Sequence, residues 1–247
     1  MPAIPFALQL YTVRGHMEKD PIATLKAVKA AGYDFVELAG RAGYPPREFR
    51  KVLDDCGLTA ISSHTSLEEI AKDPHSVVSA AQELGYKYLP FSGNAPDIQG
   101  WIGLGRHANE AGETLRKAGL QLCYHNHAHE FTRFEGKYAY DILMENAAAE
   151  HLAAEIDVFW VRFGGLDPVA HIRKYSGRCP LLHIKDMTAE PPYTFTEVGQ
   201  GTIDMPAVFR AGQEAGTQWY IVEQDECARD PLESIRISAE YMRKQSF

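Results

Sequence analysis

The sequence has few of the features that mark a redox protein, a membrane protein or a secreted protein. Its 247 residues include only four cysteines, and no two of them have the Cys-x-x-Cys spacing of redox or zinc motifs. No run reaches the ~18 apolar residues needed to cross a bilayer, and the N-terminus lacks the basic and apolar regions of a signal peptide. We therefore expect structural free thiols, no membrane partner and a location in the reducing cytoplasm.

An excess of positive charge is also missing. Lysine and arginine number 25 against 33 aspartates and glutamates, which gives a formal net charge of −8. An acidic protein has no general attraction for the phosphate backbone, and no Lys/Arg cluster suggests a locally basic groove. We therefore expect no nucleic-acid partner and a small-molecule substrate instead. The sequence leaves the oligomeric state open, a homo-oligomer included.

The glycine-rich motif of dinucleotide-binding folds does not follow the first strand-like run, which argues against that fold. The chain instead alternates apolar strand-like runs with helical segments from end to end, as βαβ units do. Eight such units in a chain close to the typical length of about 250 residues predict a (β/α)8 TIM barrel, with residues 1–247 forming a single domain. The expected strands are 6–12, 34–39, 58–64, 86–92, 120–127, 152–160, 179–185 and 219–225.

Glycines and Asp-Pro pairs mark the expected helix ends. A glycine follows each of five helical segments, where a left-handed cap is needed, at positions 32, 57, 85, 119 and 216. Asp-Pro pairs at 20–21, 167–168 and 230–231 predict a capping carboxylate followed by proline in the first turn. The long Pro- and Gly-containing segment 187–204 follows the seventh strand, and we expect it to cover a substrate.

Four of the expected strands carry potential metal ligands near their C-terminal ends, which meet at one mouth in a parallel barrel. Taken alone, Glu223 could equally form a salt bridge, and His183 could be a satisfied buried polar residue. Together they form a mixed imidazole and carboxylate set that suits Mn, Co, Zn or Fe. We predict one divalent cation, manganese first with Co, Mg, Zn or Fe as alternatives, bound by Glu130, Asp157, His183 and Glu223.

The fifth strand leaves the first ligand open. Glu130 is the only carboxylate near its end, but it can reach the cation only if the backbone turns after His127. His125 is the rival for this position. His127 would then lie beside the cation, and it is the candidate general base because histidine titrates near neutral pH.

Further polar and aromatic residues near the same mouth are candidates for substrate binding, although each of them has a structural role as its alternative. Lys185 shares a strand face with His183 and could donate a hydrogen bond to a developing oxyanion, and the ligand Glu223 could also act in proton transfer. Tyr11 falls near the mouth as well. The candidate substrate-binding residues are Gln9, Glu37, His64, His125 and Trp160.

Five segments from the second half of the chain, YHNHAHEF, EIDVFWV, LLHIKD, FTEVGQGTID and YIVEQDE, closely resemble the xylose isomerase-like TIM barrels called sugar phosphate isomerase/epimerase. FALQLYTVR and GYDFVEL, near the N-terminus, extend the resemblance over nearly the whole chain. The resemblance implies one divalent metal held by Glu, Asp, His and Glu, which map onto Glu130, Asp157, His183 and Glu223. Many relatives place the first Glu inside strand five, where this chain has His125 or His127.

The expected activity is a metal-dependent isomerisation or epimerisation of a small sugar or polyol, without a phosphate group because no arginine cluster is present. A metal that chelates adjacent hydroxyl and keto oxygens acidifies the neighbouring C–H for removal by a base. The alternative is a lyase or dehydratase that acts on a keto-sugar, keto-glycoside or inosose; a single histidine base favours it. More remote alternatives are a non-catalytic sugar-binding barrel and a DNA-repair endonuclease of the same fold, which the acidic charge disfavours.

Overall fold

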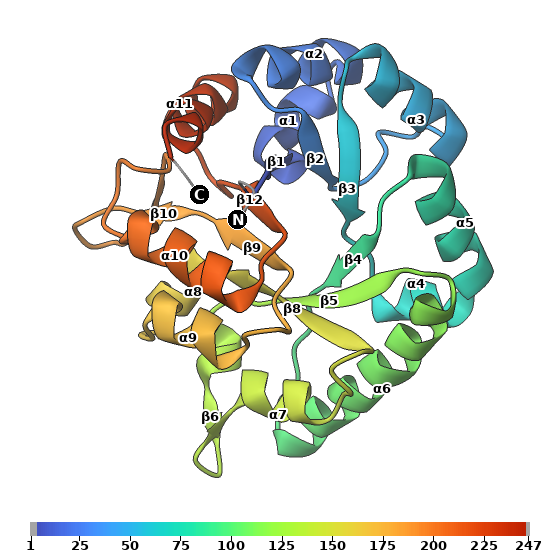
Figure 1. Ribbon diagram of the computed structural model, residues 1–247, viewed down its shortest axis with the longest axis vertical. Coiled ribbons are helices and arrows are strands. Elements are labelled where there is room, and N and C mark those ends of the chain that lie inside the picture. Colours follow the sequence, from blue (N-terminus) through green and yellow to red (C-terminus); the bar gives the residue numbers. More distant parts are fainter. Residues whose placement is uncertain (1–3, 246–247) are drawn as a thin grey trace.

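Eight parallel strands close into a barrel in the computed structural model, which describes residues 4–245 (Figure 1). Around the barrel the strands follow one another in chain order, as in a (β/α)8 TIM barrel, so the predicted fold class is confirmed. The barrel strands are β1 (Phe6–Gln9), β2 (Phe35–Leu38), β3 (Thr59–Ser63), β4 (Tyr88–Phe91), β5 (Gln121–His125), β8 (Leu152–Asp157), β9 (Leu181–Ile184) and β12 (Trp219–Val222).

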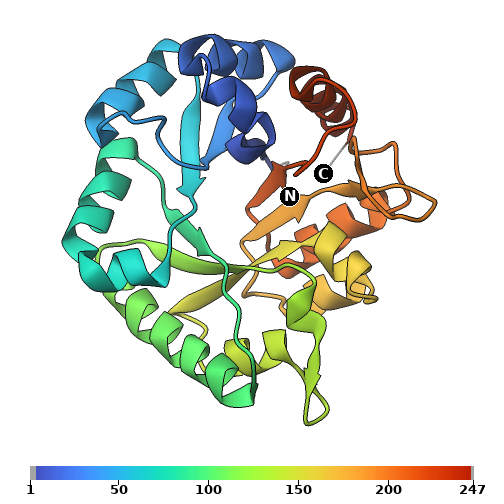
Figure 2. The same ribbon diagram turned by 180° about the vertical axis from the view of Figure 1, so that it is seen from behind.

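Helices surround this ring of strands, as the two opposite views show (Figures 1 and 2). None of the helices within residues 4–245 is both long and apolar enough to span a membrane. The α-helices are α1 (Arg14–Met17), α2 (Pro21–Ala31), α3 (Pro46–Asp55), α4 (Leu67–Lys72), α5 (Pro74–Leu84), α6 (Ile98–Lys117), α7 (Ala139–Glu145), α8 (Val158–Phe163), α9 (Pro168–Lys174), α10 (Met205–Ala215) and α11 (Pro231–Arg243).

The sequence signals for helix ends are confirmed. All five predicted capping glycines have a positive φ, between 73° at Gly57 and 104° at Gly32. The aspartates of the three Asp-Pro pairs accept a hydrogen bond from a backbone N–H in the first turn, as Asp20 does from Ala23 N at 2.9 Å. These features are local, so the sequence reveals them without knowledge of the tertiary structure.

Several strands end earlier than predicted. The segment expected as a strand over 152–160 leaves the barrel at Asp157, and Trp160 lies in α8. The reason is a helix cap, because Asp157 Oδ1 accepts a hydrogen bond from Trp160 N at 3.0 Å. The first strand likewise ends at Gln9 and continues into a 3-10 helix, η1 (Leu10–Val13), and the fifth ends at His125 before a second one, η2 (His129–Phe131).

The segment 187–204 that follows β9, which we call the strap, is ordered. A short antiparallel hairpin pairs β10 (Asp186–Met187) with β11 (Phe195–Thr196), and the Asp186 carboxylate accepts hydrogen bonds from the backbone N–H groups of Gly199, Gly201 and Ile203. A second small hairpin, β6 (Arg133–Phe134) with β7 (Lys137–Tyr138), follows η2.

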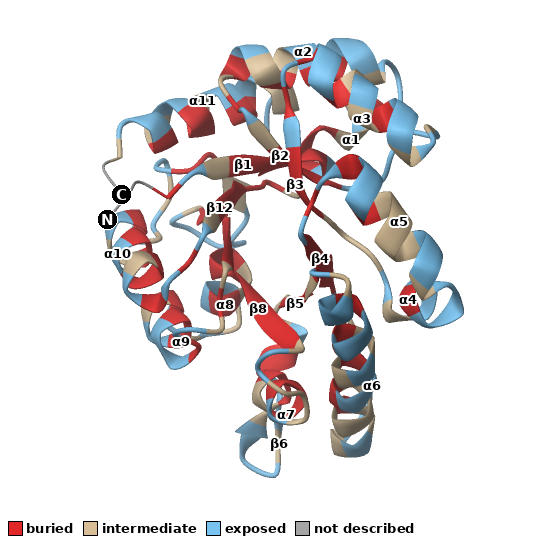
Figure 3. Cartoon of the chain, turned by 45° about the vertical axis from the view of Figure 1, so that its right-hand side comes forward, coloured by how far each residue is buried: buried red, intermediate tan, exposed pale blue. Residues whose placement is uncertain are grey.

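The interior of the barrel changes from apolar to polar along its axis, while the barrel strands and the inward faces of the helices are buried (Figure 3). One apolar layer inside the barrel contains residues such as Ala7, Ile61, Leu181 and Ile221. Nearer the C-terminal ends of the strands, the buried residues are carboxylates, histidines and a lysine. Buried charge is costly unless it is paired or bound to a cation, so the functional site is expected at this end of the barrel.

Candidate metal centre

A cavity of about 430 Å³ opens at the C-terminal ends of the barrel strands. This is the end at which TIM-barrel enzymes carry their active sites. Gln9, His64 and His125, all predicted to bind substrate, border it, whereas Glu37 and Trp160 are not among its bordering residues. The bordering residues are Gln9, Tyr11, Ala39, His64, Ser92, His125, His127, Lys185, Glu223 and Asp225.

Four buried side chains bring potential ligand atoms within 4.8 Å of one another: His125, Asp157, His183 and Glu223. Strand register explains part of this arrangement, because Asp157 on β8 lies directly opposite His183 on β9. Glu223 is the first residue after β12. The structure thus brings together three of the four predicted ligands, and His125 occupies the fourth place. We call these four residues the quartet.

Glu130 does not join the other predicted ligands. After β5 the chain turns into η2, which leaves the Glu130 carboxylate buried between Tyr124 and the backbone of His127. One carboxylate oxygen accepts a hydrogen bond from Tyr124 Oη at 2.9 Å, and the other accepts one from His127 N at 3.0 Å. The structure therefore does not place Glu130 with Asp157, His183 and Glu223 as the sequence predicted. Glu130 instead fixes the backbone that carries His127, and His125 lies with the other three ligands.

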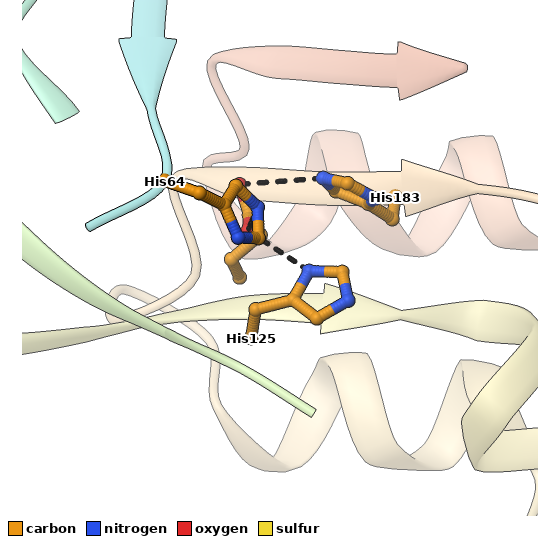
Figure 4. A group of neighbouring side chains, drawn as sticks. His64, His125 and His183 are labelled. Atoms are coloured by element: carbon orange, nitrogen blue, oxygen red, sulfur yellow. Dashed lines mark hydrogen bonds and ion pairs between the residues drawn. The ribbon is translucent and has the colours of Figure 1, made fainter. Parts of the chain in front are cut away.

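Two buried glutamates hold the nitrogens of the quartet histidines that face away from the shared centre. His125 Nδ1 lies 3.0 Å from Glu155 Oε2, and His183 Nε2 lies 2.9 Å from Glu37 Oε1. His125, His183 and the neighbouring His64 converge from the ends of β5, β9 and β3 (Figure 4). An ionised carboxylate can only accept, so each contact places a proton on the outer nitrogen and leaves the inner nitrogen as the potential ligand.

The environments of the two quartet histidines differ. Burial, reinforced by the positive charges of His183, His64 and Lys185, lowers the pKa of His125 well below its usual value, so His125 is neutral. Burial alone would also lower the pKa of His183, but Glu155, Glu37 and Glu223 outweigh it and raise that pKa. In this structure His183 Nδ1 lies 2.8 Å from Glu223 Oε2, and the raised pKa of His183 favours a proton on this nitrogen. A bound cation would replace that proton.

Lys185 is almost fully buried among three carboxylates. Its Nζ lies 2.7 Å from Glu223 Oε2 and 2.9 Å from both Asp157 Oδ2 and Asp225 Oδ1. Burial lowers the pKa of Lys185, but the three negative charges outweigh that effect and raise it above its usual value, so the side chain is an ammonium ion. This ammonium neutralises part of the negative charge at the mouth.

The Asp157 carboxylate fits a cation ligand. One oxygen caps α8, and the other, Oδ2, is buried without a hydrogen bond among the described residues. Lys185 lies 2.9 Å from Oδ2 but not along a hydrogen-bonding direction. Burial raises the pKa of Asp157 to about 6, which shows how poorly protein groups alone compensate its charge. Two imidazole nitrogens and two carboxylate oxygens form a donor set that suits Zn, Mn, Co or Fe.

His127 lies at the side of the cavity, with its ring 5.6 Å from that of Trp160. Burial, and next the charge of Lys185, lower the pKa of His127 to about 4, so the ring is neutral and can accept a proton. Opposite influences act on His64, where Glu37 and Glu155 outweigh burial and raise the pKa to about 10. The Phe195 ring of the strap stacks on that of Phe159, with centroids 4.1 Å apart, so the strap packs against α8.

Sequence reasoning gave little weight to two of the carboxylates. Glu37 was predicted to bind substrate and Glu155 was not among the predicted site residues, yet both are fully buried and contact histidines of the quartet. In the strand predicted over 219–225, Asp225 shares a face with Glu223, and this was the sequence signal for its contact with Lys185. Gln9 Nε2 donates to Glu37 Oε1 at 2.7 Å and thereby connects β1 to this network.

Comparisons with known proteins identify the family of this chain and proteins with a similar fold. The family model described as xylose isomerase-like TIM barrel matches residues 25–245. A curated relative, inosose dehydratase from Geobacillus thermodenitrificans, is 24% identical, and the aligned region covers 87% of this chain and 86% of the relative. A solved sugar phosphate isomerase/epimerase from Parabacteroides distasonis superposes with a TM-score of 0.87 at 25% identity, covering 98% of this chain and 94% of that one. The zinc-bound IOLI protein shares the fold, with a TM-score of 0.73 at 16% identity over 97% of this chain and 96% of its own.

Proposed function

This chain belongs to the xylose isomerase-like TIM-barrel family, and we propose that it is a divalent-metal-dependent isomerase or epimerase of a small sugar or polyol. The observation that carries the proposal is the quartet, whose ligand atoms lie within 4.8 Å of one another at the mouth of the barrel. A cation held there by four protein groups keeps open positions for substrate oxygens.

His125, Asp157, His183 and Glu223 would hold the cation, with Glu155 and Glu37 orienting the two imidazoles. When bound, the cation would polarise a substrate carbonyl and acidify the adjacent C–H. The manganese, cobalt, iron and zinc ions all accept such a mixed donor set, so the proposal names the class of cation and leaves the native metal to measurement.

His127 is the proposed base, because it borders the cavity as a neutral imidazole and its backbone is fixed by Glu130. Lys185 would donate a hydrogen bond to the oxygen on which negative charge develops, and Asp225 would keep the ammonium at that place. Glu223 borders the same cavity and is the second group that can exchange a proton with substrate. Gln9 and His64 are proposed to bind hydroxyl groups.

A lyase is the second candidate. Curated relatives are named inosose dehydratase, and a dehydratase begins with the same proton removal beside a carbonyl. In this chain His125 stands in the quartet, inside strand five, where many relatives have a glutamate, so the second carboxylate of a two-base epimerase is absent from that place. One base and one proton donor suffice for elimination, whereas inversion at carbon requires a proton to return from the opposite face.

The first experiment is elemental analysis of purified protein after reconstitution with Mn²⁺, Co²⁺ or Zn²⁺. About one equivalent should be retained by wild type and lost in His125→Ala, Asp157→Ala, His183→Ala and Glu223→Ala. Glu130→Gln should keep the metal, and exposed His75→Ala serves as the matched histidine control. Retention in His125→Ala together with loss in Glu130→Gln would restore the ligand set that the sequence predicted.

Reaction class is then tested by solvent exchange. Proton removal beside a carbonyl should place deuterium from D₂O on that carbon of a ketose, an inosose or a keto-glycoside, as followed by NMR. A rearranged sugar identifies the isomerase or epimerase, and an unsaturated product identifies the lyase. Metal retention without exchange in any of the three substrate classes would contradict the proposed activity.

A further inference from the structure

We infer that the substrate is a glycoside, whose second ring lies in a further cavity between α1 and the segment that follows β2. This inference rests on the proposed function and adds a substrate class to it. The second cavity measures about 370 Å³ and is bordered by Leu10, Arg14, Met17, Glu18 and Pro21 on one side and by Ala39, Gly40 and Ala42 on the other. Ala39 borders both this cavity and the central one, so the two cavities meet there.

The residues where the two cavities adjoin are small. Ala39 and Gly40 are exposed, and a Cβ added to Gly40 would meet no atom within 4 Å. Ligand cavities generally measure about 300–1,000 Å³. The central cavity, at about 430 Å³, lies at the lower end of that range, which suits one small ring. A free monosaccharide bound in the central cavity would therefore leave the second cavity filled with water, and a second ring could occupy that space.

Tyr11 forms an aromatic wall of the central cavity, and its partner Arg14 borders the second cavity. Its side chain is 44% exposed, although exposed tyrosines are usually mobile. Here the Arg14 guanidinium covers one face of the ring at 4.0 Å from its centroid, and Arg14 Nη1 donates to the carbonyl oxygens of Tyr11 at 2.9 Å and Asp225 at 2.8 Å. Tyr11 borders the central cavity and Arg14 borders the second, so each member of this pair lines one of the two cavities.

The chemistry of this wall suits a sugar ring or a ring-shaped aglycone. An aromatic ring held in one orientation offers an apolar surface for the C–H face of a ring, at little cost in conformational entropy. Among residues 4–245, the Glu18 carboxylate and Arg14 Nη2 take no hydrogen-bond or ion-pair partner. They supply an acceptor and a donor in the second cavity, which is what hydroxyl groups require.

The test is calorimetric binding to the Mn²⁺-loaded protein, with glucose, galactose and xylose compared with cellobiose, lactose and xylobiose. We expect each disaccharide to bind at least tenfold more tightly than its matched monosaccharide. Glu18→Trp fills the second cavity and should abolish this preference while leaving the monosaccharide affinities within twofold. Lys19→Trp is the matched control, because Lys19 is exposed on the neighbouring position and borders neither cavity.

The outcomes separate this inference from the proposed function. Equal affinity for disaccharides and monosaccharides, or a preference that survives in Glu18→Trp, would overturn the second-ring site while leaving the sugar enzyme intact. Binding of monosaccharides alone would overturn it as well. A protein that binds neither the metal nor any of the six sugars would instead remove the proposed function, and this inference with it.

Discussion

Replacement of Lys185 by methionine should make the protein bind a divalent cation more tightly. The Lys185 ammonium lies 2.7 Å from Glu223 Oε2 and 2.9 Å from Asp157 Oδ2, and these are the two quartet oxygens proposed as metal ligands. An ammonium ion and a metal ion cannot share both oxygens at once. Metal binding must therefore push Lys185 towards Asp225, and that displacement costs free energy that the variant would not have to supply.

The size of the effect follows from the charges. Two unit charges about 4 Å apart interact by about 4 kcal/mol at an effective dielectric constant near 20. In wild type, most of the interaction energy that Lys185 loses when a metal binds is recovered because the ammonium stays with Asp225. We expect a net cost of about 1.4 kcal/mol to remain in wild type, so its absence in Lys185→Met should raise the metal affinity tenfold. The metal-free variant should also be less stable, because removing one partner of a buried ion pair typically costs about 3–5 kcal/mol.

Both quantities can be measured on the same samples. Competition with a chelator gives the Mn²⁺ affinity, and thermal unfolding with and without Mn²⁺ gives the stability of each state. Lys174→Met is the matched control, since Lys174 pairs with Asp141 on the outside of the barrel and is half exposed. An affinity that is unchanged or weaker in Lys185→Met would show that the ammonium supports the metal ligands instead of competing for them, and the reasoning would fail.

Three further predictions test the surroundings of the site. Glu155→Gln and Glu37→Gln should each weaken Mn²⁺ binding about 10- to 100-fold, measured by chelator competition, because the quartet imidazoles lose an orienting carboxylate. Burial lowers the pKa of His171 to about 4, so only unfolded His171 takes up a proton between pH 6.5 and pH 4, and the free energy of unfolding should fall by about 3 kcal/mol over that range. Denaturant titrations should show that the free energy of unfolding depends less on pH in His171→Gln than in wild type. The same pH dependence in both proteins would contradict this. In Gly112→Ala, the new Cβ would lie 2.0 Å from the His151 carbonyl oxygen, so we expect a loss of about 1–3 kcal/mol by denaturant titration, whereas Gly103→Ala on the same helix meets open space and should stabilise by about 0.5–1 kcal/mol.

Local chemistry explains why the barrel could be predicted from the sequence. Gly32 and the other capping glycines mark helix ends through a backbone conformation that other residues disfavour, and the Asp-Pro pairs mark helix starts through a short-range hydrogen bond. The predicted convergence of Asp157, His183 and Glu223 needed only one more fact, that parallel strands end at one mouth.

The first ligand position could not be settled in the same way. Glu130 and His125 are five residues apart, and the choice between them depends on where β5 stops and how the chain turns into η2. That turn is stabilised by the contact of Glu130 with Tyr124, and this interaction leaves no periodic pattern in the sequence from which it could be predicted. The contact of Glu37 with His183 could not be predicted for a related reason, since His183 lies 146 positions away and is reached only across the closed barrel.

The charge at the mouth is the strongest reason to regard this site as functional. Five carboxylates surround the quartet histidines and one lysine: Glu37, Glu155, Asp157, Glu223 and Asp225. Such a cluster destabilises the fold, because buried carboxylates lose hydration and repel one another, and apolar residues of similar volume would pack there at lower cost. Asp157 Oδ2 and Glu155 Oε1 even lack hydrogen bonds among the described residues. Proteins keep such unfavourable arrangements where function requires them, and the proposed divalent cation would supply the compensating charge that the protein side chains leave incomplete.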